Sequence, residues 1–120
     1  MVGILTVTDF RDSENWKQAR LIVCTILEYT ESLSKRMEFR SVTKDIERLS
    51  ITVLDKIAEG YERNTNQSFL SRAQQAIDEL EQQLAILSHQ GGIEESDSLG
   101  LKEKLDGVKK SLNEDPSTIH

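Results

Sequence analysis

Apolar side chains recur every three or four residues through most of this 120-residue chain, and that spacing constrains its fold more than any other feature. One turn of an α-helix takes about 3.6 residues, so side chains at this spacing share one face of a helix. The clearest stripe consists of Val42, Ile46, Leu49, Val53, Ile57 and Tyr61. A half-buried strand would require strict alternation instead. The pattern therefore predicts an all-α protein.

Three further stripes indicate three further helices. Their apolar residues are Trp16, Ala19, Val23, Ile26, Leu27 and Leu33 in the first, Phe69, Ala73, Ala76, Ile77, Leu80, Leu84 and Leu87 in the third, and Leu101, Leu105, Val108 and Leu112 in the fourth. The second stripe is widened by Ile51, Leu54 and Ala58. A single apolar seam does not need this extra width, so the second helix is expected to contact more than one neighbour.

Caps and turn residues set the expected boundaries. Asp12 or Ser13 can cap the first helix, and Ser96 or Asp97 can cap the fourth. The expected helices run from the first cap to about residue 33, from about 41 to 62, from the turn at residues 64–66 to about 90, and from the last cap to about 112. Short connections favour antiparallel neighbours, so an antiparallel up-down-up-down four-helix bundle is expected in one domain, residues 1–112. Residues 113–120 are expected to form a disordered tail.

The net charge of −6 is unevenly distributed along the chain. Residues 73–101 hold six acidic side chains and no basic one, whereas the positive and negative charges balance on either side of this segment. An acidic chain is not a simple polycationic nucleic-acid binder. The segment instead suggests a docking surface for a basic partner, or merely a solvated face.

A series of basic residues offers a different hypothesis. If the second helix extends backward, Arg36, Arg40, Lys44 and Arg48 share one face, and Lys17 and Arg20 of the first helix could lie near them. Such a stripe can bind the phosphates of a nucleic acid. Asp45 and Glu47 interleave with it, so an ordinary solvated face remains the alternative.

No arrangement of residues indicates catalysis, a metal or a cofactor. The two histidines, His89 and His120, are far apart, and neither belongs to the Glu-x-x-His pair of di-iron bundles. The only cysteine, Cys24, lies in an apolar run and is expected to be buried as a small hydrophobe. No segment reaches the length of a membrane span or resembles a signal peptide. These features favour a cytoplasmic protein that is not an enzyme.

Several short motifs resemble a known family. The matching residues are Phe10, Trp16, Lys17 and Ala19, then Ile57-Ala58-Glu59-Gly60 with Arg63, Ser68-Phe69, and Glu79-Leu80 with Leu84, leading to Gly92-Ile93. The chain resembles the small bacterial four-helix bundle proteins encoded by intervening sequences in large ribosomal RNA genes. Their relatives include the accessory variability determinant of diversity-generating retroelements.

The resemblance implies a homopentamer of four-helix protomers without enzymatic activity. It assigns a structural or interface role to Trp16, Ile57, Ala58, Glu59, Gly60, Arg63, Phe69 and Glu79. In the retroelement branch it also implies binding to a reverse transcriptase and RNA. The leading hypothesis is therefore an oligomeric helical scaffold that serves as an accessory protein in a retroelement or ribosomal RNA insertion context. The alternative is a protein–protein interaction module that uses the acidic helix surface without nucleic acid.

Overall fold

The computed structural model describes residues 13–62 and 67–114. Within these ranges the chain forms four α-helices, one short 3-10 helix and no strand. The α-helices are α2 (Glu14–Leu33), α3 (Arg40–Glu62), α4 (Gln67–His89) and α5 (Glu95–Glu114), and the 3-10 helix is η2 (Met37–Phe39). The all-α prediction is confirmed.

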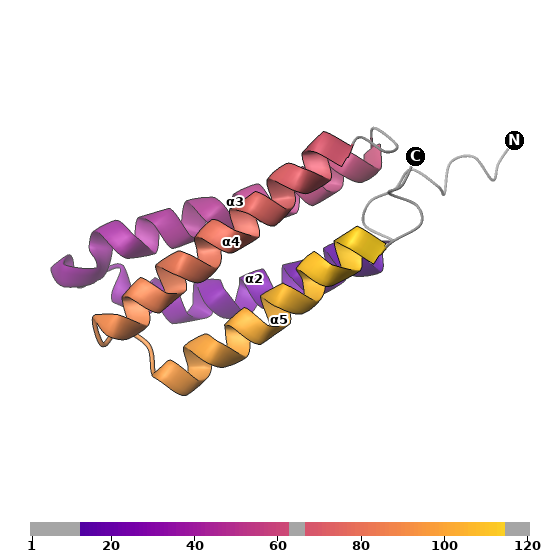
Figure 1. The fold of residues 1–120 in the computed structure, drawn as a ribbon. Helices are drawn as coiled ribbons and strands as arrows, with labels where there is room; N and C mark the ends of the chain where they lie inside the picture. The colour runs from indigo at the N-terminus through magenta and orange to yellow at the C-terminus, as the bar shows by residue number, and fades with distance from the viewer. Residues whose placement is uncertain (1–12, 63–66, 115–120) are drawn as a thin grey trace, which may run out of the picture.

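The four helices lie side by side, and each runs antiparallel to the next (Figure 1). Helices α3 and α4 share the most extensive contact, while α2 packs on both α3 and α5 and closes the bundle. Residues 34–39 and 90–94 connect helices at one end of the bundle, here called the loop end. The start of α2 and the end of α5 lie at the opposite end, here called the terminal end. This is the up-down-up-down arrangement expected from the sequence.

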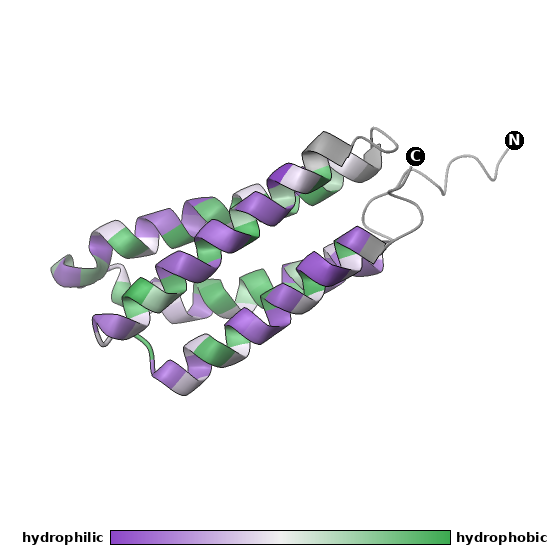
Figure 2. Cartoon of the chain, viewed as in Figure 1, coloured by the Kyte–Doolittle hydropathy of each residue, from purple (hydrophilic) through white to green (hydrophobic). Residues whose placement is uncertain are grey.

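The apolar stripes form a single core. Green and purple residues alternate along each helix in Figure 2, as expected when one face is buried and the other is solvated. The buried stripe residues include Val42, Ile46, Leu49, Val53 and Ile57 of α3, Ala73, Ala76, Ile77, Leu80, Leu84 and Leu87 of α4, and Leu101, Leu105, Val108 and Leu112 of α5. On α2, Ala19, Val23 and Ile26 are buried, and Trp16 and Leu33 pack partly buried against the core.

Helix starts agree with the sequence at α2 but not at α5. Ser13 caps α2, because its Oγ accepts a hydrogen bond of 3.2 Å from the backbone N–H of Trp16. Helix α5 begins at Glu95, so the expectation that Ser96 or Asp97 caps it is wrong. Both residues lie within its first turn, which follows directly after buried Ile93 and exposed Glu94. At its other end α5 continues to Glu114, two residues past the expected boundary.

Two glycines end α4 and allow a close approach at the loop end. Gly91 has a φ of 86°, a left-handed conformation that glycine adopts without a steric penalty. Its N–H donates to Ser88 O and that of Gly92 donates to Leu87 O, which is the Schellman pattern of a helix C-terminus. Phe39 of η2 packs against the same turn, and a Cβ on Gly92 would lie 3.2 Å from its ring.

Cys24 is exposed, so the expectation of a buried thiol is wrong. The core-facing residues of α2 are Ala19, Ile22, Val23 and Ile26. Cys24 lies about 140° around the helix from Ala19, at 100° per residue, and therefore on the opposite face. The run from Leu21 to Cys24 is apolar on every side of the helix, so its composition did not reveal which residues face inward.

A substitution in α5 tests the helix assignment. Gly107 is exposed, and a Cβ there would meet no atom within 4 Å. Gly107→Ala should therefore raise the free energy of unfolding by about 0.5–1 kcal/mol through helix propensity. Gly92→Ala is the matched control, because its Cβ would lie 2.5 Å from Leu87 Cδ1 and should lower stability by about 1–3 kcal/mol. Urea denaturation of both variants measures the contrast, and effects of equal sign would contradict it.

Candidate interaction surfaces

Helix α3 carries three of the predicted basic residues on its outer face. Arg40, Lys44 and Arg48 are exposed and follow one another at intervals of four residues, so they form a slowly turning row. The Arg48 guanidinium lies 3.7 Å from Asp45 Oδ1 in a solvated pair. The row is open to solvent along about two turns of the helix.

Arg36 does not join this row. Helix α3 begins at Arg40 and is preceded by η2, so the backward extension that would align Arg36 does not occur. Arg36 instead bonds Glu38 at 2.9 Å, and its guanidinium lies 4.8 Å from the centre of the Phe39 ring. Both contacts are local, and they place Arg36 over an aromatic residue of the loop end.

Lys17 and Arg20 lie at the other end of the molecule. They are exposed near the start of α2, where they line a hollow together with Trp16 and Leu21. Because α2 and α3 are antiparallel, this hollow lies toward the terminal end, whereas Arg40 lies at the loop end. Lys17 and Arg40 therefore lie toward opposite ends of the bundle, and Arg36 stands outside the row on α3.

The family-motif residues gather toward the terminal end. Ile57 and Gly60 of α3 are buried, Ala58 and Glu59 are half-buried, and Trp16 packs against the core from α2. Glu59 forms an ion pair with Lys56 at 3.2 Å. Arg63 lies outside the described residues, as does the Phe69 side chain. Glu79 is exposed on α4 and lies apart from this group in the sequence.

Large apolar side chains are also exposed on the helices. Leu21 of α2 is 64% exposed and Ile51 of α3 is 54% exposed. Ile51 lines a hollow between α2 and α3 with Leu27, Glu31 and Glu47. The sequence predicted extra apolar width on α3, and Ile51 supplies it. The sequence did not indicate that Leu21 is exposed, because Leu21 belongs to the same apolar run as buried Ile22 and Val23.

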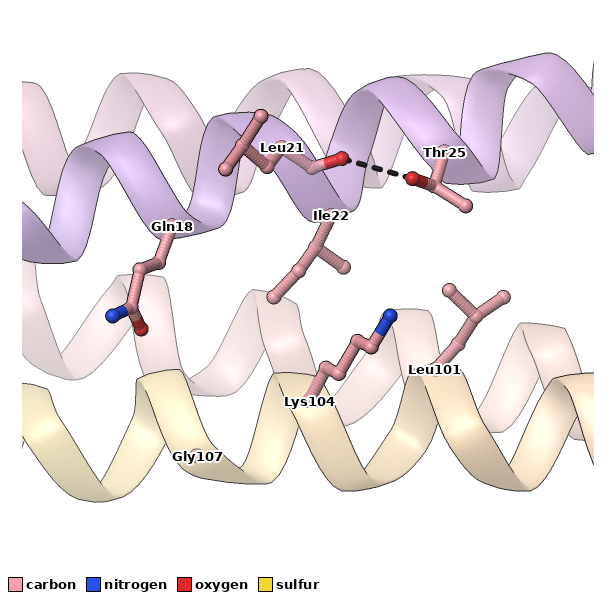
Figure 3. Close-up of a pocket in the computed structure, with 7 residues that line it drawn as sticks. All are labelled: Gln18, Leu21, Ile22, Thr25, Leu101, Lys104 and Gly107. Atoms are coloured by element: carbon pink, nitrogen blue, oxygen red, sulfur yellow. Dashed lines mark hydrogen bonds between the residues drawn. The ribbon is translucent and has the colours of Figure 1, made fainter.

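An apolar groove runs between α2 and α5 (Figure 3). Its volume is about 410 Å³, and it is lined by Gln18, Leu21, Ile22, Thr25, Leu101, Lys104 and Gly107. Ile22 extends from α2 toward α5, and Leu101 and Lys104 extend from α5 toward α2 (Figure 3). The missing side chain at Gly107 keeps one part of the groove open.

Charged residues of α4 and α5 meet in a cluster that the sequence did not predict. Lys109 of α5 contacts Asp78 Oδ1, and its Nζ lies 3.9 Å from Glu81 Oε1 of α4 and 3.5 Å from Asp106 Oδ1. Lys102 bonds Asp106 at 2.9 Å. We call these five residues the seam cluster. Two of the six acids in the segment 73–101, exposed Asp78 and largely buried Glu81, therefore pair with a lysine of the neighbouring helix.

The two interacting carboxyl groups of the seam cluster titrate very differently. Burial, followed by the hydrogen bond with Asp106, raises the pKa of Glu81 to about 7. The hydrogen bonds with Glu81 and Lys102 lower the pKa of Asp106 to about 2. Glu81 is only 10% exposed, and its Oε2 is buried without a hydrogen-bond partner. A neutral Glu81 beside an ionised Asp106 fits this environment.

The described residues contain neither a cluster of metal ligands nor a membrane-spanning helix. Among residues 13–62 and 67–114, no group of three or more His, Cys, Asp or Glu side chains is arranged to hold a metal ion. None of the described helices is long and apolar enough to cross a membrane.

A family model matches most of the chain. The model of the family described as 23S rRNA-intervening sequence protein matches residues 11–114. No curated protein and no solved structure matches the chain. The matched range includes all four helices, and it agrees with the resemblance noted in the motifs around Trp16 and Gly60.

Proposed function

The chain belongs to the 23S rRNA-intervening sequence protein family. From this premise we propose that it is a non-enzymatic, oligomeric helical scaffold that serves as an RNA-binding accessory protein in a retroelement or ribosomal RNA insertion context. The family is one of small helical proteins and is not a known enzyme family. A reverse transcriptase is a further candidate partner in the retroelement branch.

The exposed apolar residues of α2 and α3 support self-association. Monomeric proteins commonly expose single apolar residues, but Leu21 and Ile51 each lie beside a hollow that a complementary surface can fill. Such an arrangement suits an interface between copies, in which a side chain of one protomer enters the hollow of the next. A homopentamer is the assembly that the family resemblance favours.

The row formed by Arg40, Lys44 and Arg48 supports contact with RNA. Guanidinium and ammonium groups exposed on one helix face can bind successive phosphates, and this contact does not require a chain of positive net charge. Lys17 and Arg20 offer a second, separate point of contact. The basic groups occupy α2 and α3, on different helices from the acidic segment of residues 78–97.

The alternative is a protein-binding module that uses the acidic surface alone. Glu79, Glu94, Glu95 and Asp97 are exposed on or just before α4 and α5 and could receive a basic partner. However, Asp78 and Glu81 are already held by Lys109, which reduces the negative charge available for a partner. This observation favours the scaffold over the acidic module.

Assembly and RNA binding are tested by two measurements on the same protein. Light scattering at micromolar concentration should give several times the 13.6 kDa mass of one chain. Filter binding to a structured ribosomal RNA fragment should weaken steeply as salt rises. Replacing both Arg40 and Lys44 with glutamine should reduce the slope of log affinity against log salt by about 2.

The matched control removes equal charge from α5. Replacing both Lys104 and Lys110, exposed on that helix, with glutamine should leave the slope unchanged. A strict monomer would defeat the assembly proposal. Binding that is absent at low salt would defeat the RNA proposal and favour the acidic module. An equal reduction in both double variants would contradict the assignment of the contact to Arg40 and Lys44.

A further inference from the structure

The seam cluster holds three carboxyl groups and two ammonium groups at the contact of α4 with α5. Helix α4 contributes Asp78 and Glu81, and α5 contributes Lys102, Asp106 and Lys109. The Lys109 ammonium pairs with all three carboxyl groups. Within the cluster, Lys102 forms an ion pair with Asp106. Full ionisation would therefore leave the cluster with one negative charge in excess.

Glu81 is the member least suited to carry that charge. Its side chain is 10% exposed, and Oε2 has no hydrogen-bond donor within reach. Asp78 and Asp106 are more exposed, and each bonds a lysine directly. A proton on Glu81 removes the excess charge and supplies a hydrogen bond to the Asp106 carboxylate.

We propose that Glu81 and Asp106 share one proton in the folded bundle, and that loss of this proton weakens the contact between α4 and α5. The pair thereby acts as a proton-controlled latch on α5. The proton resides on Glu81, and Asp106 accepts its hydrogen bond while remaining ionised beside Lys102.

The direction of the pH effect follows from the two carboxyl groups. The pKa of Glu81 is about 7 in the folded protein against a reference of 4.5, so the folded chain retains a proton that the unfolded chain has released. The contribution of Glu81 to the stability of the folded chain is fully present below pH 4.5 and is lost as pH rises through about 7. Asp106, with a pKa of about 2 against 3.8, contributes stability above pH 3.8 that is lost as pH falls toward 2.

Helix α5 is the element that such a change would loosen. Its interior contains Gly100 and Gly107, which lower its intrinsic helical stability. It also forms one wall of the groove shared with α2, to which it contributes Leu101 and Lys104. Releasing the proton therefore weakens the helix that defines this groove, while α3 and α4 keep their more extensive contact.

Urea denaturation between pH 5 and pH 8 tests the latch. The ratio of folded to unfolded wild-type protein should fall by about tenfold or more across this range, a value reduced from the full two-and-a-half-unit shift because solvent screens part of the cluster. Glu81→Gln should abolish most of this fall, since the amide donates a hydrogen bond to Asp106 and never ionises. Both proteins keep His89 and His120, so a dependence due to histidine would persist in the variant.

Glu79→Gln is the matched control, because Glu79 is an exposed carboxyl group on the same helix. This variant should keep the wild-type dependence on pH. Carbon NMR of the Glu81 carboxyl should give a midpoint near 7, and Asp106→Asn should lower that midpoint by removing a partner that favours the protonated form. Hydrogen exchange, corrected for its intrinsic pH dependence, should show protection lost first in α5.

A Glu81 midpoint near 4.5 would overturn the proposal. An unchanged pH dependence in Glu81→Gln would also overturn it, as would protection lost equally from α3 and α5. The NMR measurement is made on the folded wild-type chain, so it remains decisive even where a variant fails to fold.

Discussion

Ile57→Ala should lower the free energy of unfolding by about 2–5 kcal/mol, because this isoleucine is fully buried in the core of the bundle. The substitution removes three carbon atoms from the buried face of α3 and leaves a cavity that neighbouring helices fill only in part. Urea denaturation, monitored by the helical circular dichroism signal, measures the loss.

Ile51→Ala is the matched control on the same helix. Ile51 is 54% exposed, so the same chemical change should alter stability by less than about 1 kcal/mol at low protein concentration. Under the proposed assembly, this variant should instead shift the light-scattering mass toward one chain. A larger loss of unfolding free energy in Ile51→Ala than in Ile57→Ala would contradict the assignment of Ile57 to the buried face of α3 and of Ile51 to its exposed face.

Phe39→Ala should produce the second large effect, a loss of about 3–5 kcal/mol. Phe39 is 4% exposed at the loop end, where its ring fills the space beside Gly92 under the Arg36 guanidinium. Removing the ring eliminates the contact that joins the connection before α3 to the turn after α4. Thermal and urea denaturation should both report the loss.

Met37→Ala is the corresponding control. Met37 lies in the same 3-10 helix and is 80% exposed, so its truncation should cost less than about 0.5 kcal/mol. Similar losses for the two variants would show that η2 itself, rather than the Phe39 ring, holds this end together.

The fold was largely predictable from periodicity. Val42, Ile46, Leu49, Val53 and Ile57 differ by three or four positions, a spacing that places all five on one face of an α-helix, and all five are buried. Phe39 was not identified as a core residue because it lies outside every stripe, in a turn whose direction depends on tertiary contacts. Cys24 was misassigned because neighbours on all sides of it are apolar.

The candidate surfaces were only partly predictable. Four-residue spacing placed Lys44 and Arg48 on one face of α3, since both lie within a single helix. It failed for Arg36, because a 3-10 turn separates that residue from the helix. The meeting of Glu81 with Asp106 involves two helices, and spacing along one helix cannot determine which residues face each other across a contact.

The four antiparallel α-helices of residues 13–62 and 67–114 give the bundle a polarity. The start of α2 and the end of α5 emerge on the same side, opposite Phe39 and the Gly91-Gly92 turn. Fluorophores attached near Glu14 and Asn113 would therefore report on one pole, and a dye near Met37 on the other. In any ring built from parallel copies, the aromatic pole and the terminal pole would form two chemically distinct rims.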